Sequence, residues 1–151
     1  MLEFAVSVKA IQRELERRTN EAMEPLGLTA AQADALAVIG QAGPLSLKDL
    51  GELLIAEGGH PSRLVDRLVE AGLVERRPGE DRRRVVLSLT PEGRRKARRV
   101  EQVRADLMKL ATELVGDRDF TPALALMRDL LQFTSFADLV ERRRRLLENS
   151  D

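Results

Sequence analysis

The fold is decided by residues 61–93, which read PSRLVDRLVEAGLVERRPGEDRRRVVLSLTPEG. Pro61 suits the first position of a helix, because the N–H that proline lacks has no partner there in any case. Apolar side chains then recur at helical spacing, at Leu64, Val65 and Leu68. Gly72 suits the left-handed conformation that ends many helices. These features predict an amphipathic helix over residues 61–71.

A β-hairpin is predicted directly after this helix. Residues 73–77 and 82–89 form two short strand-like runs, and the letters PGED between them are typical of a turn. The side chains expected to alternate inward in the second run are Val85, Leu87 and Leu89. Thr90 then suits the N-cap of a further helix, with Pro91 at its first position.

Upstream of the decisive stretch, the first predicted helix covers residues 2–25. Its apolar side chains fall on one face, at Phe4, Val8, Ile11 and Leu15. Pro25 and Gly27 end this helix, because neither residue continues a helix well.

Two capping boxes predict the next two helices. Thr29 and Gln32 begin a helix that extends to Gly40 or Gly43. Ser46, with an acidic residue three positions later, begins a short helix. The inner face of the short helix is formed by Leu47, Leu50 and Leu54.

A long helix is predicted over residues 91–115, after the hairpin. Its apolar residues form a heptad seam suited to packing against another helix, at Val100, Val103, Leu107, Leu110 and Leu114. Gly116 breaks this helix. A last helical region is expected over residues 121–147, bent near residues 134–135.

Together these elements predict a mainly α fold with a small β-hairpin wing. Residues 29–90 form a winged helix-turn-helix unit within one domain spanning 1–151. The flanking helices, 2–25 and 91–148, are too long and too apolar on one face merely to cap so small a centre. We therefore expect them to be dimerisation helices, although packing within one chain remains an alternative for both apolar stripes.

The charge of the chain is unevenly distributed. Its 25 basic and 25 acidic residues cancel to a net charge of zero. The segment from Arg76 to Arg99 holds ten basic and three acidic residues, so it carries +7 and the remainder carries −7. A local basic region of this kind is typical of nucleic-acid binding.

Several function classes are excluded or disfavoured by composition. The chain has no Cys and a single His, which excludes disulfides, thiol redox sensing and cysteine-based metal sites. It has no glycine-rich phosphate loop and no nucleophile–base motif, so we expect neither enzymatic activity nor a cofactor. No secretion signal or membrane-spanning run is present in this sequence, and we expect a cytoplasmic protein.

The helix over 61–71 is the candidate recognition helix. The side opposite its apolar face carries Ser62, Arg63, Asp66, Arg67 and Glu70. Arginine is the residue best suited to reading guanine bidentately in the major groove. The alternative is an ordinary solvated helix, on which these arginines pair with the neighbouring carboxylates.

Three consecutive arginines, Arg82, Arg83 and Arg84, follow the hairpin turn. One or two of them can reach a neighbouring minor groove, where the negative potential attracts arginine. The alternative is a charged edge that prevents strand pairing, but lysine or glutamate would serve that purpose equally well.

Four segments resemble the MarR family of transcriptional regulators: LVDRL at 64–68, AGLVER at 71–76, DRR at 81–83 and LSLTPEG at 87–93. The resemblance implies a homodimer whose first and last helices interlock. It also implies that two winged units contact adjacent major grooves of a pseudo-palindromic double-stranded DNA operator, usually to repress transcription.

By position, the resemblance assigns the DNA contacts as follows. Ser62 and Arg63 face the bases, and Arg67 faces the backbone. Arg83 enters the minor groove with Arg82 and Arg84 beside it, while Ser46 and Lys48 bind phosphate. The chain departs from the family at residues 58–61, which read GGHP, so His60 contacts DNA or is simply a turn residue.

The resemblance further implies release from DNA by a small aromatic or apolar ligand. We expect such a ligand between the first, second and long fifth helices, in an apolar pocket with an arginine. The alternative function is a winged-helix protein-interaction module without specific DNA binding.

Overall fold

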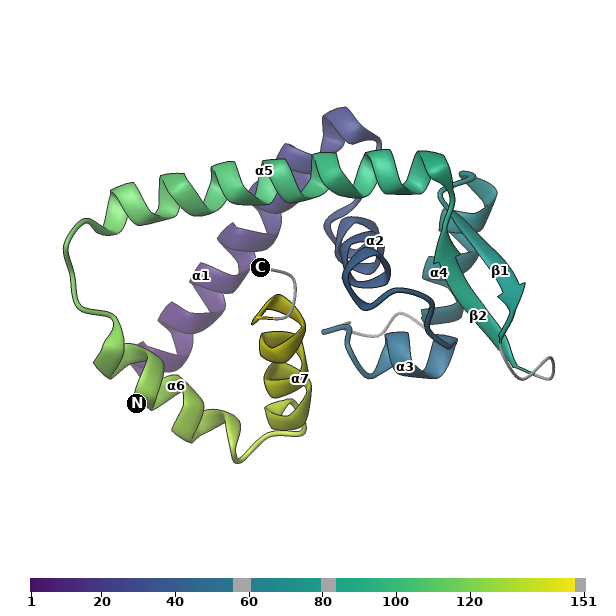
Figure 1. Ribbon diagram of the computed structural model, residues 1–151. Coiled ribbons are helices and arrows are strands. Elements are labelled where there is room, and N and C mark those ends of the chain that lie inside the picture. The colour runs from purple at the N-terminus through teal and green to yellow at the C-terminus, as the bar shows by residue number, and fades with distance from the viewer. Residues whose placement is uncertain (56–60, 80–83, 149–151) are drawn as a thin grey trace.

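The computed structural model describes residues 1–55, 61–79 and 84–148 (Figure 1). The elements are, in order, α1 (Leu2–Met23), the 3-10 turn η1 (Glu24–Leu26), α2 (Ala30–Ala42), α3 (Leu47–Gly51), α4 (Pro61–Glu70), β1 (Val74–Pro78), β2 (Val85–Leu89), α5 (Pro91–Val115), α6 (Thr121–Leu131) and α7 (Ala137–Glu148). This order confirms the predicted mainly α fold with a hairpin wing. The first helix ends slightly earlier than predicted, because Pro25 lies in the 3-10 turn.

The winged core is built around α2. Six of its residues are buried: Ala33, Ala35, Leu36, Ala37, Val38 and Ile39. The helix is nearly surrounded, since α1, α3, α4, β2 and α5 all pack against it. The largest fully buried side chains that complete this core from the other elements are Met23, Leu50, Val65, Leu68, Val74, Leu87 and Val100. Burial of this aliphatic surface is the main force that holds the unit together.

Both predicted capping boxes are present and fix where α2 and α3 begin. The Thr29 N–H donates to Gln32 Oε1 at 2.9 Å, and the Gln32 N–H donates to Thr29 Oγ1 at 3.2 Å. Ser46 and Asp49 exchange the same two bonds at the start of α3. These reciprocal bonds satisfy backbone donors that a helix start leaves without partners.

The hairpin pairs β1 with β2 in antiparallel register, from Val74 opposite Leu89 to Pro78 opposite Val85. Leu87 also exchanges two backbone hydrogen bonds with Leu45, which ties the hairpin to the segment before α3. The inward prediction was correct for Leu87 and Leu89 but wrong for Val85, which is 57% exposed. Val85 lies opposite Pro78 in the last pair of the ladder, next to the tip of the hairpin.

The exit from the wing is fixed by Thr90 and Gly93. The Thr90 hydroxyl accepts a bond from the Gly93 N–H at 2.9 Å and donates to the Gly72 carbonyl at 2.7 Å. A Cβ on Gly93 would lie 1.9 Å from the Leu73 carbonyl oxygen, so only glycine fits this approach of α5 to the chain after α4. The glycine that ends the segment Leu89-Thr90-Pro91-Glu92-Gly93 is therefore required by packing.

The outer helices extend away from the winged core (Figure 1). The first half of α5 is anchored by the buried residues Gly93, Ala97 and Val100, whereas its last turns are exposed. α6 buries no residue, and α1 buries only Met23 at its end. Within the described part of the chain, no helix is both long and apolar enough to cross a membrane.

The last helical region is two helices, a stronger break than the predicted bend. The chain turns between α6 and α7 at Thr134, whose hydroxyl donates to the Leu131 carbonyl at 2.9 Å. The hydroxyl oxygen of Thr134 also accepts a hydrogen bond from the Phe136 N–H at 3.2 Å. This local side-chain bonding competes with the helical pattern and redirects α7 toward the winged core.

Candidate nucleic-acid interface

Helix α4 is strongly amphipathic. Val65 and Leu68 are fully buried in the winged core, while Arg63, Asp66 and Arg67 are exposed. Ser62, the other predicted base contact on this helix, is only half-exposed. The helix ends as predicted, because Gly72 is left-handed with φ 69° and Leu73 N–H donates back to the Leu68 carbonyl at 2.9 Å.

The exposed arginines of α4 do not pair along the helix. Among the described residues, neither Arg63 nor Arg67 forms an ion pair or a side-chain hydrogen bond. Asp66 instead accepts from Arg76 of β1 at 2.6 Å. The interpretation of α4 as a solvated surface of internal ion pairs is therefore wrong for this part of the chain, and two guanidinium groups remain available to an anion.

At the start of α3, Ser46 and Lys48 differ in their availability. The Ser46 hydroxyl donates to the Asp49 carboxylate at 2.6 Å, so it is occupied within the capping box. This bond, with the Ser46 N–H and the charges of Lys48 and Arg84, holds the pKa of Asp49 below its ordinary value. The Lys48 side chain is 84% exposed, and its ammonium lies 3.9 Å from Glu52.

The wing is described up to the two ends of its tip. The Gly79 N–H donates to the Arg84 carbonyl at 2.7 Å, which closes the ladder beneath the tip. Arg84 itself is exposed. The predicted contacts Arg82 and Arg83 lie outside the described residues, as does His60 before α4.

A cavity of about 860 Å³ lies behind the recognition helix. It is bordered by α1, α2, α4 and α5, with Ile55 and Phe136 completing the wall. The sequence predicted the α1, α2 and α5 walls and an arginine, but it did not predict the contribution of α4. The charged side chains of the wall are Glu16, Asp34, Arg63, Arg67 and Arg104. Arg63 and Arg67 thus belong both to the exposed part of α4 and to the cavity.

The four arginines of α7 are bound within the chain. Arg142 pairs with Glu52, and Arg143 pairs with Asp34 at 2.7 Å. Within residues 1–55, 61–79 and 84–148, Arg144 and Arg145 pair with glutamates of α7 itself, Glu141 and Glu148. These pairs provide no sign that α7 contacts DNA.

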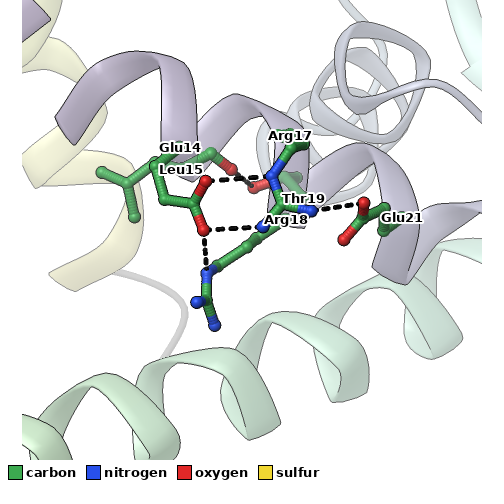
Figure 2. Close-up of polar contacts among 6 residues, drawn as sticks. All are labelled: Glu14, Leu15, Arg17, Arg18, Thr19 and Glu21. Carbon is green, nitrogen blue, oxygen red and sulfur yellow. Dashed lines mark hydrogen bonds and ion pairs between the residues drawn. The ribbon is translucent and has the colours of Figure 1, made fainter. Parts of the chain in front are cut away.

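The polar face of α1 carries its own ion-pair network, which Figure 2 shows. Glu14 accepts from Arg17 at 2.7 Å and from Arg18 at 2.6 Å, while Arg17 also reaches Glu21 at 2.5 Å. These hydrogen bonds lower the pKa of the Glu14 carboxyl to about 2. The network involves Glu14, Arg17, Arg18 and Glu21 of α1, whereas the apolar stripe of this helix from Phe4 to Leu15 remains exposed.

Comparison with known proteins identifies the unit. Residues 28–93 match the family model of a winged helix DNA-binding domain. The HTH-type transcriptional regulator YwoH of Bacillus subtilis (strain 168) is 33% identical over 105 residues, which cover 70% of this chain and 74% of YwoH.

Solved structures of MarR from E. coli extend the similarity to the outer helices. The apo wild type is 29% identical with a TM-score of 0.67, covering 84% of this chain and 95% of MarR. A MarR mutant complexed with operator DNA is 28% identical with a TM-score of 0.75, covering 85% and 94%. The winged unit, its flanking helices and these relatives together show that the chain belongs to the MarR family of winged-helix, DNA-binding transcriptional regulators.

Proposed function

We propose that the protein is a sequence-specific repressor that binds a pseudo-palindromic operator as a homodimer. The observation that carries this proposal is the exposed surface of α4, where Arg63 and Arg67 have no partner among the described residues. A recognition helix needs such free donors in the major groove. The similarity to a MarR mutant in complex with operator DNA supports double-stranded DNA as the partner.

The wing and α3 are proposed to complete the interface. Arg83, with Arg82 and Arg84, enters the minor groove, and Lys48 contacts a phosphate. Ser46 serves mainly to hold the start of α3, since its hydroxyl is bound to Asp49. His60 is proposed as an additional contact just before α4. We place this activity in the cytoplasm, because that is where bacterial operator DNA is found.

A second copy of the chain is proposed to cover the outer helices. Large apolar side chains are exposed on α1, α5 and α6, including Ile11 at 60%, Leu114 at 71% and Leu124 at 50%. Monomeric proteins rarely expose apolar patches over such an extent. A homodimer buries them and brings together the two basic segments between residues 76 and 99.

The cavity is proposed to bind a small aromatic or apolar ligand that releases DNA. Its wall combines Leu15, Leu64 and Phe136 with the arginines of α4. A ligand with an acidic group can therefore contact Arg63 and Arg67, which the operator also requires. Such competition for the same guanidinium groups accounts for release.

The decisive experiment is selection of binding sites from a random duplex library, followed by fluorescence anisotropy at two salt concentrations. We expect one enriched two-half-site sequence whose affinity falls steeply with salt. Arg63→Ala should lower the affinity by roughly 1–3 kcal/mol. Arg145→Ala is the matched control, because Arg145 pairs with Glu141 of its own helix. No enrichment, together with equal binding by wild type and Arg63→Ala, would instead indicate a protein-interaction module.

A further inference from the structure

Asp34 joins three helices through one carboxylate oxygen. Asp34 Oδ1 accepts from Arg104 Nη2 at 2.9 Å and from Arg143 Nη2 at 2.7 Å. The two arginines stand 70 and 109 residues away along the chain, on α5 and α7. Their side chains are 31% and 23% exposed and that of Asp34 is 26% exposed. These ion pairs are therefore better shielded from water than the pairs within α1, in which the arginines are at least 50% exposed.

The place of Asp34 in the fold gives this junction its importance. Asp34 is on α2, whose other residues are the centre of the winged core. Arg104 lies one turn after Val100, the last buried residue of α5, so it marks the point where α5 leaves that core. Arg143 belongs to α7, which returns from the far end of the outer helices (Figure 1). Asp34 therefore fastens the winged unit to the outer part of the chain at two separate places.

A neighbouring ion pair also connects α7 to the winged unit. Arg142 of α7 pairs with Glu52, the residue that follows α3. Consecutive arginines of one helix thus hold two elements of the winged unit. The next residue, Arg144, pairs with Glu141 and Glu148 of α7 itself. Among the described residues, Arg142 and Arg143 therefore form the ion pairs that join α7 to the winged unit.

We propose that Asp34 is a positioning residue that sets the spacing between the two recognition helices of the dimer. This proposal rests on the homodimer and operator proposed above. Each winged unit is held at a defined orientation to the dimerisation helices by Asp34, and that orientation determines which half-site spacing both α4 helices can reach together.

Loss of the carboxylate changes more than one bond. Arg104 and Arg143 both lie within 3 Å of Asp34 Oδ1, so they repel one another once its charge is removed. Arg143 Nη1 is already buried with no hydrogen-bond partner in the described part of the chain. The winged unit is then less strictly oriented, and the free energy needed to order it must come from DNA binding.

The test is half-site spacing, measured by fluorescence anisotropy on the selected operator and on duplexes with one base pair added or removed between the half-sites. We expect the wild type to lose roughly tenfold in affinity for either altered duplex. Asp34→Asn should bind the native spacing more weakly and discriminate among spacings less than about threefold. Its affinity for a single half-site should stay unchanged, which a general loss of structure would not allow.

Matched variants keep the test decisive. Arg143→Gln removes one of the two ties and should reduce spacing discrimination even if Asp34→Asn does not fold. Arg144→Gln, on the adjacent residue, should retain the wild-type profile. If Asp34→Asn or Arg143→Gln keeps the wild-type spacing preference, the proposal is overturned. If the wild type selects no two-half-site sequence, the proposed function itself fails first, so the two failures are distinguishable.

Discussion

Arg76 Nη2 lies 2.6 Å from Asp66 Oδ1, which joins the first strand of the wing to the exposed face of the recognition helix. The contact crosses ten positions of sequence and leaves both side chains about half exposed. It therefore adds a side-chain contact between two elements that the backbone already joins through the turn at Gly72. We infer that this ion pair aligns α4 with the wing.

The first prediction concerns that alignment. Asp66→Asn should change the free energy of unfolding by less than about 1 kcal/mol, because exposed ion pairs contribute little. It should nevertheless lower the preference for the operator over scrambled duplex by roughly 3- to 10-fold, since α4 and the wing lose their common orientation. Anisotropy with both duplexes measures this preference.

Glu70→Gln supplies the control for this prediction. It removes a second carboxylate from the same helix, and Glu70 has no ion pair among the described residues. Both variants reduce the negative charge facing DNA by one. Equal behaviour of Asp66→Asn and Glu70→Gln would show that charge alone, rather than the contact with Arg76, is responsible.

The second prediction tests the close approach at Gly93. Gly93→Ala forces a Cβ onto the Leu73 carbonyl oxygen and should cost roughly 3 kcal/mol or more of unfolding free energy, measured by urea denaturation. Gly40→Ala is the control, because its Cβ meets side-chain atoms and no backbone, Leu89 Cδ1 at 3.3 Å and Ala97 Cβ at 3.7 Å, and a helix favours alanine. Equal stability of the two variants would contradict the packing described here.

The third prediction separates dimerisation from folding. Leu114 is 71% exposed in the single chain, so Leu114→Glu should leave the winged core intact. It should shift the protein from dimer to monomer in sedimentation equilibrium, because a charge cannot be buried in an apolar interface without a partner. Lys109→Glu, on the same helix but off the heptad seam, should remain dimeric. A dimeric Leu114→Glu protein would place the interface elsewhere.

The fourth prediction concerns Glu14. Its pKa of about 2 lies below the ordinary value of 4.5, so its stabilising contribution is complete above pH 4.5 and is lost as the pH falls toward 2. An NMR titration of the carboxyl group should show this low pKa. Arg18→Gln should raise it toward 4.5, whereas Arg13→Gln should leave it unchanged, since adjacent helix positions do not face each other. An ordinary pKa in the wild type would argue against the network in Figure 2.

Features encoded within a few residues could be predicted from the sequence. The capping boxes at Thr29 and Ser46 and the left-handed Gly72 depend on local chemistry alone, and all three are confirmed. The exposure of Val85 could not be predicted, because alternation along a strand does not indicate where the core beneath it ends. For the same reason, the sequence pattern predicted the order of the helices and strands more accurately than the burial of their residues.

Long-range ion pairs lay beyond sequence reasoning. Local spacing suggested that Asp66 pairs with arginines of its own helix, but its partner is on β1. No sequence pattern indicated the ion pairs of Asp34, since its two partners are separated from it by 70 and 109 positions. The chain offers 25 basic residues as candidates, and only the tertiary fold selects two of them.

In the proposed homodimer the order of α6 is linked to subunit concentration, because α6 buries none of its residues within its own chain. An isolated helix of 11 residues is marginal in water. A partner subunit that covers α6 therefore provides most of the stability of this helix. By mass action, the fraction of chains with an ordered α6 then depends on the concentration of the protein in the cell. Folding, assembly and operator occupancy should then rise together over a narrow range of protein abundance, so that the number of molecules becomes a regulatory input in its own right.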